Sequence, residues 1–331
     1  MIKNTLGLVI ITFIWSLNIS YVYASKINGG SQTGSYTTSF APLIQTVLSG
    51  GFFQYEIATS DGSIEAAKRI LEDPKDVSLA QLDAAYDVMK KHPGKIIMAR
   101  KLANECLFAV SPDKRLSNWA KVEKFAQRLR IATASPQSGS AFTLKSVMQM
   151  DEKSNLAKSV KHIQYAETAK DAVKMVAKGE ANLAFFVAYP DPNSSIFKYA
   201  NGKKLNIIGV AHPNMRNLKT DQGDSIYAAG NIPVEKKGFI SRKKVQTACT
   251  STVILTGDPN SFSEDSRDRD NQIALVQILK EASKDSFRPK GDKWDRILSS
   301  VREISGNAAT SLWTSGGELL EAVADNLDHK E

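Results

Sequence analysis

The chain has 331 residues, of which 42% are hydrophobic and 24% are charged, with 20 Gly and 11 Pro. This composition is typical of a globular protein and excludes a collagen, a disordered tail protein and, with only 2 Cys, a small disulfide scaffold. The formal net charge of +8 would by itself admit nucleic acid or an acidic surface as a partner. The length predicts about two domains.

The first 24 residues predict export from the cytoplasm. Lys3 precedes an apolar run from Leu6 to Leu17, and a small residue, Ala24, ends the segment. A basic start, a short apolar stretch and a small residue before the cut are typical of a signal peptide, here cleaved after Ala24. A transmembrane anchor is the alternative, but the run is shorter than the ~20 residues that span a bilayer. We therefore expect a periplasmic protein without a nucleic-acid partner.

From Lys26 onward, strand-like runs alternate with helical patterns, which predicts an α/β fold. The expected strands cover residues 53–58, 77–80, 96–99, 106–110, 129–133 and 245–256. The expected helices cover residues 63–71, 168–178, 273–279, 294–301 and 312–327. Residues 261–270 are polar and charged, and we expect them to form an exposed loop.

The two halves of the chain share a plan. Ser31 opens a loop of small polar residues after one strand, and Ser135 opens a similar loop after another. The strand at Leu79 is repeated at Leu183 with the same offset in sequence as the two loops. In the second half, Thr168-x-x-Asp171 predicts a capping box at the start of a helix, and Gly179 predicts its end. These repeats predict two α/β lobes of similar plan.

Motifs for the common enzyme chemistries are missing from the sequence. There is no His-Glu-x-x-His, no Cys-x-x-Cys, no Gly-x-Ser-x-Gly and no P-loop. Asp265, Asp268 and Asp270 resemble a calcium loop loosely, but Arg267 and Arg269 lie between them and the turn glycine is missing. We therefore expect a protein that is not an enzyme and that holds no metal and no cofactor. A secreted hydrolase that uses one of the many serines is the enzyme alternative.

Two loops rich in glycine and serine, residues 29–36 and residues 138–140, each precede a helical pattern. Glycine allows the backbone to approach a ligand closely, and hydroxyls and the free N–H groups of a helix start donate hydrogen bonds. Such a terminus favours a carboxylate or a phosphate. Helix capping alone is the structural alternative. Two equivalent loops at strand ends favour a ligand site in an interdomain cleft.

These motifs resemble those of one family of receptors. The chain is similar to type 2 periplasmic solute-binding proteins, and among them to the TAXI group of tripartite (TRAP) transporter receptors. The resemblance covers nearly all of the mature chain and is carried by residues 31–36, 61–65, 81–86, 135–140 and 245–256. One segment departs from it, because residues 312–317 stand where the family has a Gly-Ala and tyrosine-rich stretch.

The resemblance implies two lobes that are discontinuous in sequence, each with a mixed sheet flanked by helices. Lobe one is then residues 25–112 plus 250–331, and lobe two is residues 113–249; two sequential domains divided near Ser111-Pro112 are the alternative. It also implies a monomer that closes around a small organic anion, an amino acid or a dicarboxylate, and delivers it to membrane permease subunits. An ABC-type binding protein and a surface antigen are the other candidates.

The resemblance also implies the site residues and a pairing of the two cysteines. The residues carried over are Ser31, Thr33, Gly34, Tyr36, Gln81, Asp83, Ser138 and Ser140. Gln81 can orient the ligand, Tyr36 can form an apolar wall, and Asp83 fits either an acceptor for an ammonium or a hinge group. The family topology brings the strands of Cys106 and Cys249 together, so a disulfide and two buried thiols both stay open.

Overall fold

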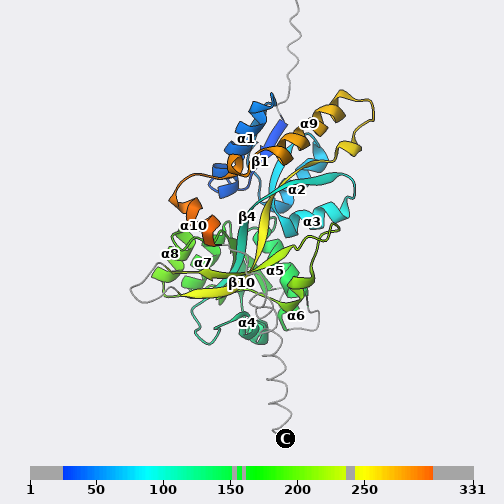
Figure 1. Ribbon diagram of the computed structural model, residues 1–331. Helices are drawn as coiled ribbons and strands as arrows, with labels where there is room; N and C mark the ends of the chain where they lie inside the picture. Colours follow the sequence, from blue (N-terminus) through cyan, green and yellow to red (C-terminus); the bar gives the residue numbers. More distant parts are fainter. Residues whose placement is uncertain (1–24, 151–154, 159–161, 236–242, 301–331) are drawn as a thin grey trace, which may run out of the picture.

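One mixed sheet runs through the protein, and helices cover both of its faces (Figure 1). The computed structural model describes residues 25–150, 155–158, 162–235 and 243–300. The strands are β1 (Ser25–Asn28), β2 (Tyr55–Ala58), β3 (Val77–Gln81), β4 (Ile96–Ser111), β5 (Ile131–Thr133), β6 (Ile163–Tyr165), β7 (Leu183–Ala188), β8 (Asn206–Gly209), β9 (Tyr227–Pro233) and β10 (Lys244–Gly257). The expected α/β class is confirmed. The signal peptide and the helix expected at 312–327 lie outside the described residues.

Helices connect most of these strands. The α-helices are α1 (Ala41–Gly50), α2 (Ser63–Glu72), α3 (Leu82–Lys91), α4 (Trp119–Phe125), α5 (Gly139–Gln149), α6 (Asn155–Lys158), α7 (Ala169–Ala177), α8 (Ser195–Gly202), α9 (Arg267–Glu281) and α10 (Asp292–Ser300). The shorter turns are η1 (Tyr36–Phe40), η2 (Ala126–Arg128), η4 (Pro213–Asn217), η5 (Pro259–Ser261) and η6 (Lys284–Phe287). Within the described ranges, no helix is both long and apolar enough to cross a bilayer.

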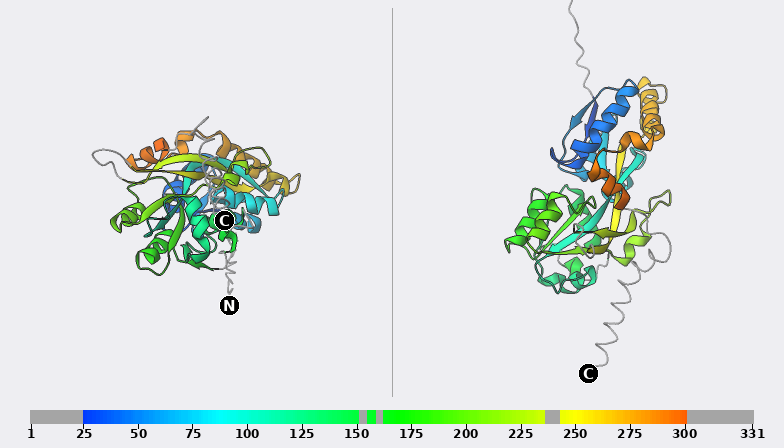
Figure 2. Two further views of the ribbon diagram at one scale, coloured as in Figure 1. Left: turned by 90° about the horizontal axis from the view of Figure 1, so that it is seen from below. Right: turned by 60° about the vertical axis from the view of Figure 1, so that its left-hand side comes forward.

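Two long strands, β4 and β10, join two lobes (Figure 2, right). The sheet order is β2-β1-β3-β10-β4-β7-β5-β6, with β8 beside β4 and β9 beside β10. Lobe one contains β1–β3, α1–α3, α9, α10 and the ends of β4 and β10 that pair there. Lobe two contains β5–β9, α4–α8 and the other ends of the two strands. The residue bounds given above for the lobes stay a prediction.

Strand β4 is continuous where the sequence predicts two separate strands. Residues 100–105 contain neither Gly nor Pro, so nothing in the backbone ends the strand between its two apolar runs. At roughly 3.3 Å per residue it extends for about 50 Å. Its pairing with β10 shifts register between Ser251 and Val253 and again between Ile254 and Leu255. Such bulges increase the local twist, and here they lie where the sheet passes from one lobe to the other.

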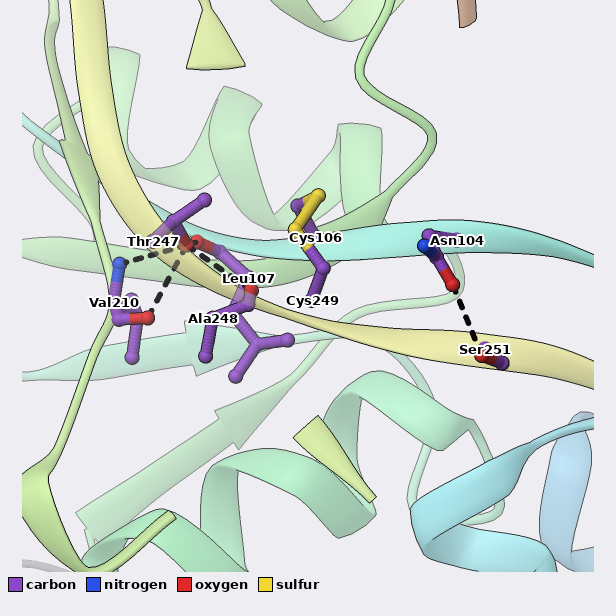
Figure 3. The surroundings of a disulfide bond; sticks show 8 residues. All are labelled: Asn104, Cys106, Leu107, Val210, Thr247, Ala248, Cys249 and Ser251. Carbon is purple, nitrogen blue, oxygen red and sulfur yellow. Dashed lines mark hydrogen bonds between the residues drawn. A yellow bond between two sulfur atoms is a disulfide. The ribbon is translucent and has the colours of Figure 1, made fainter. Parts of the chain in front are cut away.

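A disulfide bond fastens the crossing strands to each other (Figure 3). Cys106 and Cys249 lie opposite each other in the register of β4 and β10 and are joined in the structure. Beside them, Thr247 Oγ1 accepts a hydrogen bond from Val210 N at 3.2 Å. Further along, Ser251 Oγ donates to Asn104 Oδ1 at 2.9 Å. The crossing is thus held by a covalent bond as well as by the strand ladder.

Apolar side chains fill both faces of the sheet. In lobe one, the fully buried Ile44 and Leu48 of α1 pack with residues of α9 and α10 on one face. In lobe two, the rings of Phe108 and Phe197 meet edge to face with centroids 4.9 Å apart. A further cluster contains Leu82 of α3 together with residues of α4 and α5. This cluster spans both lobes, so their packing is continuous behind the crossing strands.

Two helix starts illustrate what local sequence predicts well and what it predicts less well. Thr168 caps α7 and its hydroxyl bonds both the backbone and the carboxylate of Asp171, while Gly179 has φ +78°, which confirms the expected helix signals. Helix α9, by contrast, begins at Arg267 inside the segment expected to be a loop. Ser266 caps it, so the polar composition there belongs to an exposed first turn.

Candidate ligand-binding site

A cavity of about 300 Å³ lies between the lobes where four helical segments begin. Lobe one lines it with Gly30, Ser31, Gly34, Ser35, Tyr36, Gly62, Ser63, Gln81, Glu105 and Lys293. Lobe two and the segment after β7 line it with Ser138, Gly139, Ser140, Val187, Ala188, Tyr189, Asp191, Ser194 and Ile196. The starts of η1, α2, α5 and α8 therefore all border the same space.

Six of the eight residues predicted from the sequence line this cavity. They are Ser31, Gly34, Tyr36, Gln81, Ser138 and Ser140. Thr33 does not line it and is an exposed residue of the first loop. Asp83 does not line it either and is buried beside it.

The first loop is folded tightly onto the ends of β1 and β2. Gly29 N donates to Ala58 O at 2.8 Å, and Thr37 Oγ1 donates to Gly30 O at 3.0 Å. A Cβ on Gly29 would lie 2.4 Å from that threonine hydroxyl, so the close approach requires glycine. Ser35 begins η1 without a side-chain cap, and Ser31 is exposed. The loop thus presents uncommitted hydroxyls to the cavity.

The second loop uses its hydroxyls differently. Ser138 Oγ caps α5 by accepting from Ala141 N at 3.1 Å, and it donates to Ser135 O at 2.7 Å. Ser140 Oγ accepts from Val187 N at 3.0 Å. Both hydroxyls are hydrogen-bonded to the backbone. The main contribution of this loop to the cavity is therefore the backbone at the start of helix α5.

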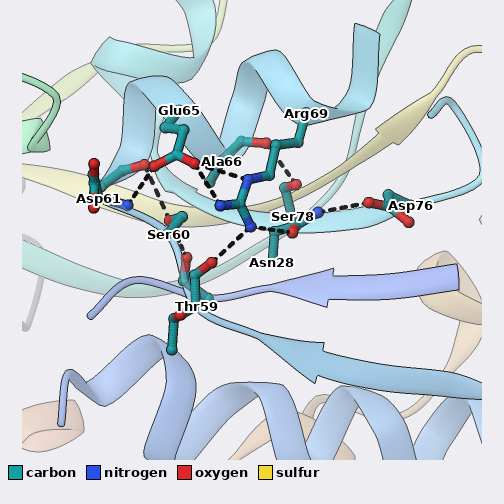
Figure 4. Close-up of polar contacts among 11 residues, drawn as sticks. Asn28, Thr59, Ser60, Asp61, Glu65, Ala66, Arg69, Asp76 and Ser78 are labelled. Carbon is teal, nitrogen blue, oxygen red and sulfur yellow. Dashed lines mark hydrogen bonds and ion pairs between the residues drawn. The ribbon is translucent and has the colours of Figure 1, made fainter. Parts of the chain in front are cut away.

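A network of partly buried polar side chains positions the start of α2 (Figure 4). The Arg69 guanidinium forms an ion pair with Glu65 one turn earlier on the helix. The same guanidinium donates to Asn28 Oδ1 at 3.0 Å and to Thr59 O at 2.6 Å. Glu65 Oε2 in turn accepts from Asp61 N at 2.5 Å. Helix α2 is thereby tied to the carboxyl ends of β1 and β2.

The lobes touch at the starts of α2 and α5. Ile64 N donates to Gln137 O at 3.3 Å, and Ser135 Oγ donates to Asp61 O at 3.1 Å. Gly62 adopts φ +142°, and a Cβ on it would lie 2.5 Å from Ser138 Cα. Only glycine fits both that backbone conformation and that contact. The structure therefore shows the lobes closed against each other.

Gln81 and Glu105 lie on either side of β10, opposite Thr252 and Thr250 respectively. Gln81 is 3% exposed; its backbone N donates to Ser63 Oγ at 3.1 Å, while its side-chain Oε1 has no hydrogen-bond partner. Glu105 is 7% exposed and accepts from Tyr36 OH at 2.6 Å. Tyr36 thus contributes a polar hydroxyl where the sequence suggested an apolar wall. The cavity contains two buried acceptors.

Burial raises the pKa of the Glu105 carboxyl to about 7. The hydrogen bond from Tyr36 opposes this shift, and the nearby Asp83 adds to it. Sequence reasoning missed Glu105. The available signal was a carboxylate directly before the apolar run 106–110, since an acid inside a buried strand is rare unless it has a role.

Asp83 belongs to a buried network that joins the lobes. It accepts hydrogen bonds from Thr143 Oγ1 of α5 and from Tyr227 OH of β9, the latter at 2.7 Å. Burial raises the pKa of the Asp83 carboxyl, while these two donors oppose the shift. Asp83 of lobe one is thus hydrogen-bonded to two elements of lobe two.

The remaining polar lining residues were not identified from the sequence. Tyr189 OH and Thr252 Oγ1 lie 2.7 Å apart in a hydrogen bond. Ser194 Oγ is buried without a partner, and Lys293 stacks over the ring of Trp294 at 5.0 Å. Across the described ranges, no three His, Cys, Asp or Glu side chains are grouped so that they could hold a metal ion.

Comparison with known proteins gives likeness in fold alone. The sequence matches no protein-family model and none of the curated proteins. Among solved structures, the ligand-binding core of GluR0 in complex with L-glutamate is 8% identical with a TM-score of 0.47, over 84% of this chain and 99% of that one. PhnD1 from Prochlorococcus marinus with methylphosphonate is 11% identical with a TM-score of 0.47, over 90% and 98%. Iron-bound HitA from Pseudomonas aeruginosa is 14% identical with a TM-score of 0.45, over 88% and 99%. These likenesses assign no ligand to this chain.

Proposed function

We propose that this protein is an exported receptor that captures a small zwitterion of the amino-acid class between its lobes. One observation carries the proposal. The cavity is lined by Gln81, whose buried Oε1 has no hydrogen-bond partner, and by the buried acid Glu105, in a space bordered by four helical starts. A ligand with a donor group at one end and an anionic group at the other matches both halves of this lining.

The acceptor side of the cavity favours an ammonium group. A buried acceptor without a partner costs about 1–3 kcal/mol, and a donor from the ligand would satisfy Gln81 Oε1. The ionised Glu105 carboxylate attracts a cation and repels a second carboxylate. This is why an amino acid fits better than a dicarboxylate, the two classes that the sequence left open.

The donor side favours an anionic group. Helix starts carry unsatisfied N–H groups and a partial positive charge. These N–H groups can replace the water molecules bound to a carboxylate, so the carboxylate can be bound there without a buried cation. Lys293 from α10 adds an exposed ammonium at the same cavity. Ser31 supplies a hydroxyl that no part of the fold requires.

The receptor role includes delivery to a membrane permease of the tripartite type, with the chain acting as a monomer. Support for this comes from the expected signal peptide and from the motif resemblance. An ABC-type permease would use the same binding chemistry. A hydrolase is disfavoured because the described cavity lining contains neither histidine nor cysteine, so no serine there has an imidazole base.

The test is identification of the bound solute, followed by substitution of Gln81. Mass spectrometry of the protein purified from the periplasm should detect an amino acid released on denaturation. Gln81→Met keeps the length of the side chain and removes the acceptor, and we expect affinity for that solute to fall about tenfold or more. Gln277→Met, an exposed position on α9, is the control. A released dicarboxylate, or unchanged affinity in Gln81→Met, would contradict the proposal.

A further inference from the structure

We infer that solute capture by this site is coupled to loss of a proton from Glu105, so that neutral surroundings favour binding and mildly acidic surroundings favour release. The inference rests on the proposed function, because it requires a solute with a cationic group. It concerns the regulation of the site by pH, about which the sequence motifs and the fold say nothing.

Among the side chains that the structure describes, the immediate surroundings of Glu105 contain no cation that could neutralise it at close range. Tyr36 of η1 donates to its carboxylate, and Gln81 at the end of β3 lies across β10 from it. Asp83 of α3, Tyr189 after β7 and Asp191 are the other ionisable groups near it or in the same lining. Each of these is acidic or neutral.

The basic group that lines the described cavity is Lys293 of α10, and its side chain is exposed and stacked on Trp294. Thr252 of β10 faces the carboxyl with a hydroxyl. Among the described residues, the charge of Glu105 is therefore stabilised by neutral donors, from Tyr36, Gln81 and Thr252. A buried acid in this setting holds its proton more tightly than in water.

The solute supplies the cation that is missing. In the empty site, the Glu105 carboxyl holds a proton for part of the time near neutral pH, in line with its raised pKa of about 7. When an ammonium group enters, the ionised carboxylate pairs with it and the proton leaves to solvent. No bond other than that O–H bond breaks, so one proton is released for each protonated site that is filled.

The direction of the linkage separates two kinds of solute. For a zwitterion, affinity falls by up to tenfold for each pH unit below the pKa of the empty site, since protonation competes with the ammonium. A dicarboxylate placed beside Glu105 would raise the pKa of that carboxyl further, and its binding would take up a proton. The sign of proton exchange on binding is therefore diagnostic.

The first experiment uses an amino-acid probe chosen by thermal shift from a panel of the twenty common amino acids. Isothermal titration calorimetry between about pH 5.5 and 7.5, in buffers of different ionisation enthalpy, gives both affinity and protons released. We expect proton release and an affinity that falls by about tenfold or more toward the acidic end. Glu105→Gln should bind more weakly at neutral pH and lose the pH dependence.

Asp76→Asn is the matched control variant. Asp76 is also a buried carboxyl with a pKa raised by burial, but it lies outside the cavity and bonds Lys26 N and Asn28. We expect this variant to keep the pH dependence of binding. Tyr36→Phe removes a donor that holds the carboxylate, so it should move the pH midpoint of binding upward.

A second experiment needs no solute and keeps the ionisation of Glu105 testable if no amino acid binds. A carboxyl whose pKa is raised on folding stabilises the native state while it is protonated, and this contribution is lost as pH rises from about 4.5 to about 7. Denaturant unfolding of the empty protein should therefore show a loss of stability over this window that Glu105→Gln lacks.

The outcomes are distinct. Failure of the whole amino-acid panel, with the unfolding difference intact, overturns the proposed function and the coupling to a zwitterion but leaves the raised pKa standing. Binding of an amino acid without proton release, or with equal pH dependence in wild type and Glu105→Gln, overturns the coupling while the receptor role stands. Proton uptake on binding of an amino acid overturns the coupling, because an ammonium paired with Glu105 would release a proton.

Discussion

Two of the places where the lobes meet are built very differently. At the crossing, β4 and β10 are joined by a strand ladder and by the disulfide between Cys106 and Cys249. At the mouth of the cavity, α2 and α5 share two hydrogen bonds and a close contact at Gly62. The first junction is covalent, whereas the second consists of a few weak interactions beside the buried hydrogen bonds of Asp83 with Thr143 and Tyr227. A receptor that closes around a solute would require this difference. It needs one permanent junction, which acts as the hinge, and one reversible junction, which can open.

The largest expected effect comes from breaking the permanent junction. Replacing both Cys106 and Cys249 with serine should lower the free energy of unfolding by about 3–5 kcal/mol, because the bond closes a loop with a sequence separation of 143 residues. Guanidinium denaturation measures this change, and reduced wild type is the control. Solute affinity well below the melting temperature should persist. Loss of binding in the folded variant would mean that the crossing controls the site directly.

An intermediate effect is expected from breaking the reversible junction. A methyl group in Gly62→Ala would force the backbones at the starts of α2 and α5 apart and strain a residue at φ +142°, which costs about 1–3 kcal/mol in the closed state. We expect affinity to fall about tenfold or more, and small-angle scattering with saturating solute to show a larger radius of gyration than wild type.

Gly202→Ala is the control for this variant, since a Cβ there meets no atom within 4 Å. Equal affinities in the two glycine variants would show that the contact at Gly62 does not contribute to closure.

The smallest effects should separate the two serine loops. Ser138→Ala removes the cap of α5 and should cost about 1 kcal/mol of stability. Ser31→Ala removes an exposed hydroxyl from the cavity and should change stability by less than about 0.5 kcal/mol, while weakening solute binding about fivefold. Thermal denaturation and calorimetry on the same samples measure both quantities. The opposite pattern would reassign the ligand-facing role to the second loop.

Much of the fold could be predicted from sequence because its signals are local. The alternation of strands and helices, the cap at Thr168 and the turn at Gly179 depend on neighbouring residues. The break expected inside β4 was wrong because two apolar runs separated by polar residues look like two strands. Whether the chain turns between them depends on pairing with β10, which lies far away in sequence.

The residues of the site could be predicted only where they belong to a loop with a recognisable sequence. Ser31 and Ser138 stand in glycine-rich loops before helices, and such loops are recognisable in a single sequence. Glu105 and Asp83 are both acids beside apolar residues, and the sequence singled out Asp83, whereas Glu105 is the one that lines the cavity. Their positions depend on the register of β10 against β3 and β4 and on the contact between the lobes. Neither the register nor this contact can be recognised from the neighbouring residues in the sequence.

The place of β10 in the sheet also affects the order in which the fold can be completed during synthesis. Residues 252–256 pair with β3 and residues 249–257 pair with β4, so the strand made late in translation fills the gap between two strands made early. Until it arrives, β3 and β4 expose unpaired edges of the kind that promote aggregation. Gln81 and Glu105 face each other across that same gap. A chain that ends before β10 therefore lacks the strand that lies between Gln81 and Glu105.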